Sequence, residues 1–149
     1  MAKLLSALPV GSVVKSTNTK YNGKVIRWIV GTQDTANGRT GLVAEKMITL
    51  KCFDAKEPSN TNSDRKNYGN NRYSQSNIDQ WLNSQAASWY SARHSYDAPP
   101  NNANVWSNYN EYDTEAGFLS NIEADFRKAI LDAVIRVAKN TVTDGGGYE

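Results

Sequence analysis

The chain has 149 residues, of which 39% are hydrophobic and 21% are charged. This length suits one domain with a sizeable core and is short for two. Its 17 lysines and arginines stand against 15 acids, and the resulting net charge of +2 is far from the basic excess of a typical nucleic-acid-binding protein. Composition therefore predicts a single domain over residues 1–149 and no nucleic-acid partner.

The chain carries one cysteine, Cys52, and one histidine, His94. These counts exclude an intramolecular disulfide, a Cys-x-x-Cys metal motif and a histidine-rich metal site. A catalytic Cys52–His94 pair is conceivable, because such pairs meet in space and not in sequence. Cys52 lies in the apolar run ITLKCFD, however, and a thiol in such a run is usually a small core residue.

The N-terminal stretch MAKLLSALPVGSVVK has only a short apolar run, which ends at Pro9 and Gly11. This run is too short for the hydrophobic region of a signal peptide, and no apolar run in the chain reaches transmembrane length. We therefore expect a soluble protein with no signal peptide and no membrane insertion.

Residues 1–53 are predicted to be an antiparallel β-meander with strands near 12–17, 24–31 and 41–48. Two Asn-Gly pairs, at 22–23 and 37–38, separate these strands. Asn-Gly readily supplies the two positive φ angles of a type I′ hairpin turn. Because only Arg27 interrupts the apolar residues of the second strand, we expect this strand to be central and Trp28 to lie in the core.

Residues 54–113 have a different composition. They contain 12 of the 17 asparagines, six of the eight tyrosines and three of the four tryptophans. Asparagine, serine and proline favour turns, but the aromatic residues are too many for plain disorder. We predict long ordered loops built around one helix.

The predicted helix begins after Ser76. Ser76 and Asp79 match the capping-box pattern, and the apolar residues 78, 81 and 82 fall on one helical face. Asn83 and Ser84 are expected to end this helix, because both side chains compete for backbone hydrogen bonds.

Helical periodicity returns in residues 114–143. A second capping box, Ser120 to Glu123, lies within this region, so the helix is expected to be one or two pieces joined near Ser120. Alternation around Ile135 and Val137 predicts a fourth strand, and the glycine-rich residues 144–149 predict a flexible tail. The apolar stripe of the helix consists of Phe118, Leu119, Ile122, Phe126, Ala129, Ile130 and Ala133.

These elements predict an α+β fold: an N-terminal antiparallel meander, two or three helices and long ordered loops. No nucleotide-binding or metal-binding motif is present. Asn60, Asn62 and Asp64 alternate as at the start of a calcium loop, but Arg65 replaces the required glycine and Asn71 the required glutamate. We therefore predict no metal and no cofactor.

Loop carboxylates raise a weaker possibility, a glycoside hydrolase. Such an enzyme needs two carboxyl groups about 5 to 9 Å apart, a spacing that sequence cannot supply. The acids that flank the aromatic region are more typical of solvated side chains or turn caps. We predict that the protein is not an enzyme and assign no catalytic residue. The acids in question are Asp97, Glu111, Asp113 and Glu115.

Aromatic residues alternating with asparagine and serine are the stronger functional signal. This mixture is typical of recognition loops, because the rings give rigid contact area and the amides adapt their hydrogen bonds. The alternative interpretation is that the rings pin long loops to the rest of the fold. The candidate ligand-binding residues are Tyr68, Asn70, Arg72, Tyr73, Trp89, Tyr96, Trp106 and Tyr109, and the same cluster includes Tyr90 and Tyr112.

Several segments together resemble an uncharacterised domain family. They are IRWIV, YGNNRY at 68–73, the helix at 76–84, Trp89-Tyr90, residues 98–100, residues 112–119 and KNTVTDGGG. Similar domains recur in tail-associated and other phage or prophage proteins of Clostridia-type Gram-positive bacteria, and in related surface proteins. The resemblance covers almost the whole chain and implies a C-type-lectin-like fold that displays variable loops.

The resemblance also implies a role. It suggests a binding or display domain that contacts a bacterial surface polysaccharide or protein, made in the bacterial cytoplasm and located in the virion or outside the cell after phage release. The alternative is a structural tail or baseplate module that contacts neighbouring virion subunits or forms a homo-oligomer. Family members usually continue past the glycine-rich run with further strands, so we expect a C-terminally shortened chain and an incomplete lectin-like sheet.

Overall fold

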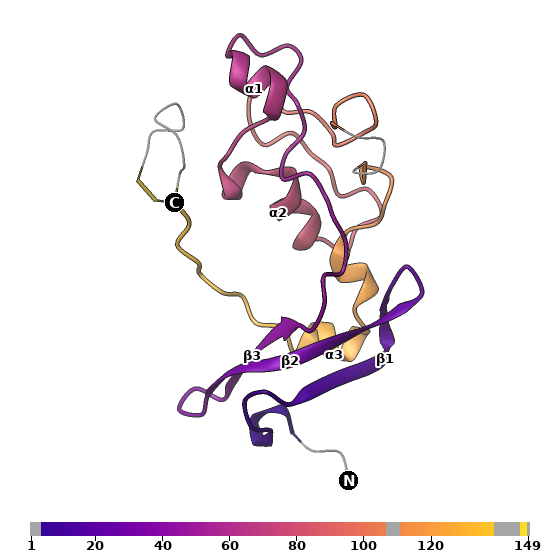
Figure 1. Cartoon of the computed structure of the whole chain (residues 1–149), viewed down its shortest axis with the longest axis vertical. Coiled ribbons are helices and arrows are strands. Elements are labelled where there is room, and N and C mark those ends of the chain that lie inside the picture. Colours follow the sequence, from indigo (N-terminus) through magenta and orange to yellow (C-terminus); the bar gives the residue numbers. More distant parts are fainter. Residues whose placement is uncertain (1–3, 107–110, 139–146, 149) are drawn as a thin grey trace. The chain divides into compact units, whose positions relative to one another are not determined.

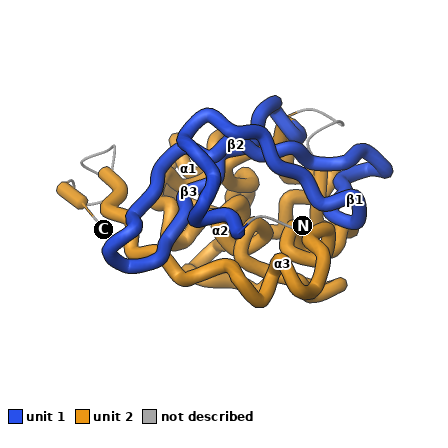
Figure 2. The backbone as a smooth tube through the Cα atoms, turned by 90° about the horizontal axis from the view of Figure 1, so that it is seen from below, with its two compact units in different colours: residues 1–49 blue, residues 50–149 orange. Residues whose placement is uncertain are grey.

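The computed structural model describes residues 4–106, 111–138 and 147–148 (Figure 1). Its backbone divides into two compact units, residues 1–49 and residues 50–149, which Figure 2 distinguishes by colour. The first unit is built on a β-sheet, and the second on short helices joined by long loops. The predicted α+β class is thus confirmed.

The sheet of the first unit has three antiparallel strands in the order β1-β2-β3. They are β1 (Val13–Tyr21), β2 (Lys24–Asp34) and β3 (Arg39–Ala44). The expected central position of the second strand is confirmed. Asn22 and Gly23 have φ angles of 48° and 75°, as the type I′ turn between β1 and β2 requires.

The turn between β2 and β3 differs from the prediction. Asp34 pairs with Arg39 across the two strands, so four residues form the turn, and of the Asn37-Gly38 pair only Gly38 has a positive φ. The Asp34 carboxylate accepts hydrogen bonds from the backbone N–H and the side-chain amide of Asn37, at 3.2 and 2.7 Å. The two-residue turn was wrong because these side-chain hydrogen bonds stabilise a longer one.

Alternation along β2 sets the two faces of the sheet. Ile26 and Val30 are buried, whereas Arg27 is exposed and pairs with Glu45 at 2.7 Å. Trp28 is half-buried, so the prediction of a core position holds only in part. Ile26 and Val30 thus contribute more fully to the core than Trp28 does.

In the second unit, the predicted helix is α2 (Asn77–Leu82). Ser76 is its N-cap, and the Ser76 Oγ accepts a hydrogen bond from the backbone N–H of Asp79 at 3.3 Å. Asn83 is the C-cap. The start, the capping residue and the end of this helix are all confirmed. A 3₁₀ turn, η2 (Tyr73–Gln75), directly precedes it.

Helix α1 (Ser63–Tyr68) was not predicted. The Asn62 side chain caps it by accepting hydrogen bonds from the N–H groups of Asp64 and Arg65, at 3.0 and 3.1 Å. None of its residues is buried, so the helix has no apolar stripe for sequence periodicity to detect. The same cap uses the Asn62 oxygen that a calcium loop would have needed.

The C-terminal helix is shorter than predicted. A 3₁₀ turn, η3 (Phe118–Asn121), and the five-residue α3 (Ala124–Lys128) replace the single long stripe. The α3 N-cap is Glu123 and makes no side-chain capping bond, so the capping box from Ser120 was wrong. Of the remaining stripe, Ile130 is exposed, and a helix without a buried face has little to stabilise it.

The strand expected around Ile135 and Val137 was also wrong. The described residues there belong to no strand, and among them only Ala138 forms an isolated bridge, with Tyr148. Val134 and Ile135 are exposed. A β-branched run remains unpaired when no neighbouring strand offers it hydrogen bonds. The predicted tail at 144–149 falls mostly outside the described residues.

Aromatic rings form the core of the second unit. The Trp81 ring lies 5.6 Å from the Tyr112 ring and 5.3 Å from the Phe118 ring, and Trp89 stacks on Tyr112 at 5.4 Å and 9°. The Lys51 amino group lies over Trp81 and Tyr112, at 5.6 and 5.3 Å. This core joins segments that are far apart in sequence.

None of the helices in the described part of the chain is long and apolar enough to cross a membrane.

Candidate functional site

The eight candidate ligand-binding residues differ in how far their side chains are exposed to solvent. Tyr109 lies outside the described residues. A residue that contacts a ligand directly needs an accessible side chain, so burial narrows the set. Tyr68, Tyr96 and Trp106 are exposed, Arg72 and Tyr73 are half-buried, and Asn70 and Trp89 are buried.

Tyr68 and Trp106 form an exposed aromatic pair. Their ring centroids are 5.8 Å apart with an interplanar angle of 15°, and the two residues are 64% and 68% exposed. The Trp106 Nε1 donates a hydrogen bond to the Asn67 carbonyl oxygen at 2.8 Å, and the Lys56 amino group lies 5.4 Å from the Trp106 ring. The pair is therefore held in one orientation while most of its surface faces solvent.

The backbone that follows Tyr68 depends on a glycine. Gly69 has φ 76° and ψ −168°, a conformation essentially restricted to glycine. A Cβ at this position would lie 2.4 Å from the Ala55 carbonyl oxygen and 2.9 Å from the Asp54 Oδ2. The close approach of these two segments brings the end of α1, and hence Tyr68, against residues 54–56.

The rings of Trp89 and Tyr73 pack against other segments and hold their loops in place. The Trp89 Nε1 donates a hydrogen bond to the Glu115 carbonyl oxygen at 3.0 Å, while its ring stacks on Tyr112. The Tyr73 ring lies 6.4 Å from that of Phe53, and burial raises the pKa of the Tyr73 hydroxyl. For these two residues the structure favours packing over recognition.

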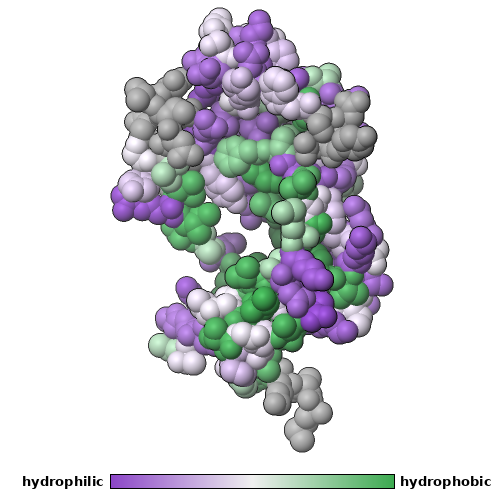
Figure 3. Space-filling model, viewed as in Figure 1, coloured by the Kyte–Doolittle hydropathy of each residue, from purple (hydrophilic) through white to green (hydrophobic). Residues whose placement is uncertain are grey.

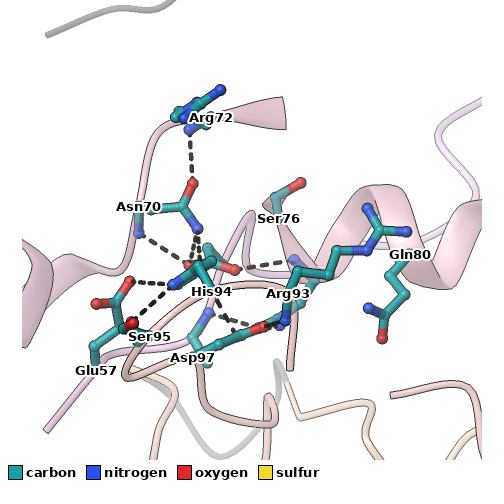
Figure 4. A network of polar contacts seen from close by, with 12 residues as sticks. Glu57, Asn70, Arg72, Ser76, Gln80, Arg93, His94, Ser95 and Asp97 are labelled. Atoms are coloured by element: carbon teal, nitrogen blue, oxygen red, sulfur yellow. Dashed lines mark hydrogen bonds and ion pairs between the residues drawn. The ribbon is translucent and has the colours of Figure 1, made fainter. Parts of the chain in front are cut away.

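Asp54 belongs to a buried polar network, which Figure 4 shows around Asn70, His94 and Asp97. The Asp54 carboxylate accepts hydrogen bonds from the backbone N–H of Asn70 at 2.9 Å, the Asn70 side-chain amide at 2.6 Å and the backbone N–H of Asn77 at 2.9 Å. Burial raises the pKa of Asp54 to about 6, although the backbone hydrogen bonds oppose this rise. Asp54 thereby ties the loop after α1 to the start of α2.

His94 faces the same network. The N–H of Arg72 donates to the Asn70 Oδ1 at 2.7 Å, which turns the Asn70 amide nitrogen toward the His94 Nε2, 3.1 Å away. The other ring nitrogen, Nδ1, lies 3.0 Å from the Ser95 carbonyl oxygen. Both ring nitrogens of His94 therefore have a polar neighbour within hydrogen-bond distance.

Glu57 and Asp97 bring two further carboxylates to His94. The Glu57 Oε1 lies 3.8 Å from the His94 Nδ1, and the Asp97 Oδ1 lies 4.0 Å from the Nε2. The side chains of Glu57 and Asp97 are 0% and 1% exposed. Asp97 accepts a hydrogen bond from the Arg93 N–H at 2.8 Å, and the Glu57 Oε2 accepts one from the Asn60 amide.

A family model described as a domain of unknown function, DUF6273, matches residues 16–149. The chain belongs to the DUF6273 family. No curated protein and no solved structure matches the chain. The DUF6273 match includes the sheet from Ser16 in β1 onward, the exposed aromatic pair and the buried network. The phage association and the C-type-lectin-like fold stay predictions, because no comparison tests them.

Sequence reasoning missed the buried network of this DUF6273 chain. Asp54 and Glu57 are close in sequence, but His94 lies far along the chain, and only the loops bring them together. The closest available signal was YGNN, which holds the glycine that allows the close approach and the Asn70 that orients the imidazole.

The candidate catalytic groups differ in their surroundings, and two of the acids, Asp97 and Glu115, have polar partners. Burial raises the pKa of the Cys52 thiol to about 11, the opposite of what a nucleophilic cysteine requires. Asp97 is held in the buried network, Glu115 pairs with Lys51, and Glu111 is exposed. Asp113 is half-buried. These contacts match the turn-capping and ion-pair roles that are usual for loop acids.

The first unit carries a concavity of about 420 Å³ beside β2 and the segment after β3. Its lining includes the exposed Arg27–Glu45 ion pair and the side chain of Met47, which is 77% exposed. It holds neither an aromatic pair nor a buried titratable cluster of the kind found in the second unit. The exposed aromatic pair is therefore the better candidate recognition site.

Proposed function

We propose that this DUF6273 chain is a non-enzymatic binding domain that contacts a bacterial surface polysaccharide through Tyr68 and Trp106. The main observation in support of this proposal is that two large aromatic side chains are stacked, exposed and held in place. Association with a phage or prophage tail is part of the same proposal and comes from the resemblance of the sequence to such proteins.

Preorganisation supports a recognition role. An aromatic side chain that is already fixed loses little conformational entropy on binding, and tyrosine and tryptophan bring large contact areas. Neighbouring residues add polar partners, since Lys56 lies over the Trp106 ring. On the face shown in Figure 3 the region of α1, the helix that ends at Tyr68, is mainly hydrophilic, as the rims of binding sites are.

The proposal is tested by binding of the purified full chain to isolated Gram-positive cell-wall polysaccharide. Trp106→Ala and Tyr68→Ala should each abolish saturable binding, and Trp106→Phe should retain part of it because a flat ring remains. Met47→Ala is the matched control, because it removes an exposed apolar side chain from the other unit. The proposal fails if the folded wild-type chain does not bind, or if the alanine variants bind as well as Met47→Ala.

A structural virion module is the second candidate, and one observation favours it. The extended residues after α3 expose Leu131, Val134 and Ile135, which are 60%, 105% and 57% exposed. Such a run of apolar side chains is typical of a surface that packs against another subunit. Light scattering separates the two roles: a stable oligomer that dissociates on Val134→Asp, without polysaccharide binding, supports the structural module.

A further inference from the structure

We propose that Asp54, Glu57 and His94 form a binding site for one divalent transition-metal ion of the Zn²⁺ class. One potential ligand atom from each of the three residues lies within 4.8 Å of the other two. The sequence predicted no metal site, and the proposed recognition function does not require one. The inference therefore stands independently of the polysaccharide proposal.

The spacing of the three side chains suits a metal centre. Zn²⁺ holds nitrogen and oxygen ligands at about 2.0 to 2.2 Å, which places the ligand atoms roughly 3 to 4 Å from one another. The Glu57 Oε1 and the His94 Nδ1 are already 3.8 Å apart. No separation in the set exceeds that range by more than about 1 Å.

The second observation is an unsatisfied atom. The Glu57 side chain is 0% exposed, and its Oε1 is buried with no hydrogen-bond donor among the described residues. Arg65 approaches this oxygen only to 3.7 Å, beyond hydrogen-bond distance. A buried carboxylate oxygen without a donor costs free energy, and a coordinated cation removes that cost. Figure 4 shows this carboxylate directed toward His94.

The buried carboxylates also favour a cation at this site. The side chains of Glu57 and Asp97 are 0% and 1% exposed, and Asp54 is buried beside them. The Arg65 guanidinium, 3.7 Å from the Glu57 Oε1, offsets part of their charge. Three buried acids around one histidine still concentrate negative charge in a medium of low dielectric constant, and a divalent cation offsets it further.

The ligand set selects the class of metal. Imidazole suits zinc and its first-row neighbours, whereas Ca²⁺ and Mg²⁺ prefer oxygen ligands alone. Histidines that bind metals commonly donate the other ring N–H to a carboxylate or a backbone carbonyl. Because Nδ1 is the nitrogen that faces Glu57, the Asp97 carboxylate, 4.0 Å from Nε2, is the group that can accept the other ring N–H.

The test is calorimetric titration of the full chain, with any affinity tag removed and metals stripped with EDTA. We expect one Zn²⁺ per chain, with Ca²⁺ binding much more weakly. Glu57→Gln and His94→Gln should each weaken Zn²⁺ binding at least about tenfold, since even residues that only support ligands contribute that much. Asp125→Asn, whose side chain is 90% exposed, and Cys52→Ser should bind like the wild type.

A second readout does not depend on the variants folding. His94 is the only histidine of the chain, so its imidazole ¹⁵N signals are assigned without ambiguity. Stoichiometric Zn²⁺ should shift the signal of one ring nitrogen in the wild-type protein. Absence of binding to the folded chain, or binding that leaves the imidazole signals unchanged, overturns the proposal. The polysaccharide assay can fail without affecting this result, and the reverse also holds.

Discussion

The second unit contains two sets of aromatic rings with the same chemistry and opposite environments. In the inner set, Trp81 is 1% exposed and its Nε1 donates to the Ala116 carbonyl oxygen at 3.1 Å. In the outer pair, Trp106 is 68% exposed and its Nε1 donates to the Asn67 carbonyl oxygen at 2.8 Å. Both indoles are hydrogen-bonded, so burial alone separates the packing rings from the pair proposed for recognition. One region rich in tyrosine, tryptophan and asparagine thus supplies both core rings and exposed rings.

The largest effect should come from the inner set. Trp81→Ala should lower the free energy of unfolding by about 3 to 5 kcal/mol, because it leaves a cavity among Tyr112, Phe118 and the Lys51 side chain. Urea unfolding followed by near-ultraviolet circular dichroism measures the change. A loss below about 1 kcal/mol would contradict the assignment of Trp81 to the core.

Gly69→Ala should have the next largest effect. The added Cβ would meet the Ala55 carbonyl oxygen at 2.4 Å, and the backbone has φ 76°, so we expect a loss of at least about 2 kcal/mol. Gly23→Ala is the matched control, because Gly23 has φ 75° but open space around it. The difference between the two thermal unfolding midpoints isolates the steric contribution. Equal midpoints would show that the approach of residues 54–55 to Gly69 is not required.

Ser76→Ala should cost about 1 to 2 kcal/mol. The Ser76 Oγ caps α2 through the Asp79 N–H and donates to the Tyr73 carbonyl oxygen at 2.7 Å, so the substitution leaves both groups without this partner. Ser88→Ala, at an exposed position outside any helix, should change stability by less than about 0.5 kcal/mol. Denaturant midpoints at a constant m-value test this pair, and equal midpoints would contradict the capping role.

The smallest effect on stability should come from the outer pair. Trp106→Ala should lower the free energy of unfolding by about 1 kcal/mol or less, the contribution of one exposed ring contact and one exposed hydrogen bond. The same variant should lose polysaccharide binding. If it unfolds the second unit as strongly as Trp81→Ala does, the two sets of rings are both packing residues and the comparison fails.

Local sequence rules succeeded where local interactions decide the structure. The Asn22-Gly23 turn follows from backbone preferences at two adjacent residues, and α2 follows from Ser76, Asp79 and three apolar positions within one turn of each other. The central place of β2 follows from its nearly continuous apolar run. Each of these elements needs only residues that are neighbours along the chain.

The rules failed where a distant partner was required or was missing. The apolar stripe through Ile130 fits a helix, and the β-branched run at Ile135 fits a strand. Both side chains are exposed, however, and neither residue lies in a helix or strand. Helix α1 shows the converse, because its cap at Asn62 stabilises it without any apolar stripe. A periodic apolar pattern predicts a helix or strand only if the fold supplies a surface against which its apolar face can pack.

By itself, the sequence determined the α+β class, the meander, α2 and the aromatic-rich character of residues 54–113. Only the tertiary structure decided which rings are buried, with Trp89 inside and Trp106 outside, and only it brought Asp54 and Glu57 to His94. The physical reason is that burial and side-chain proximity depend on loops whose paths are fixed by long-range contacts, such as Gly69 against Ala55. Composition specifies which side chains a loop contains, and packing decides which of them are buried and which face solvent.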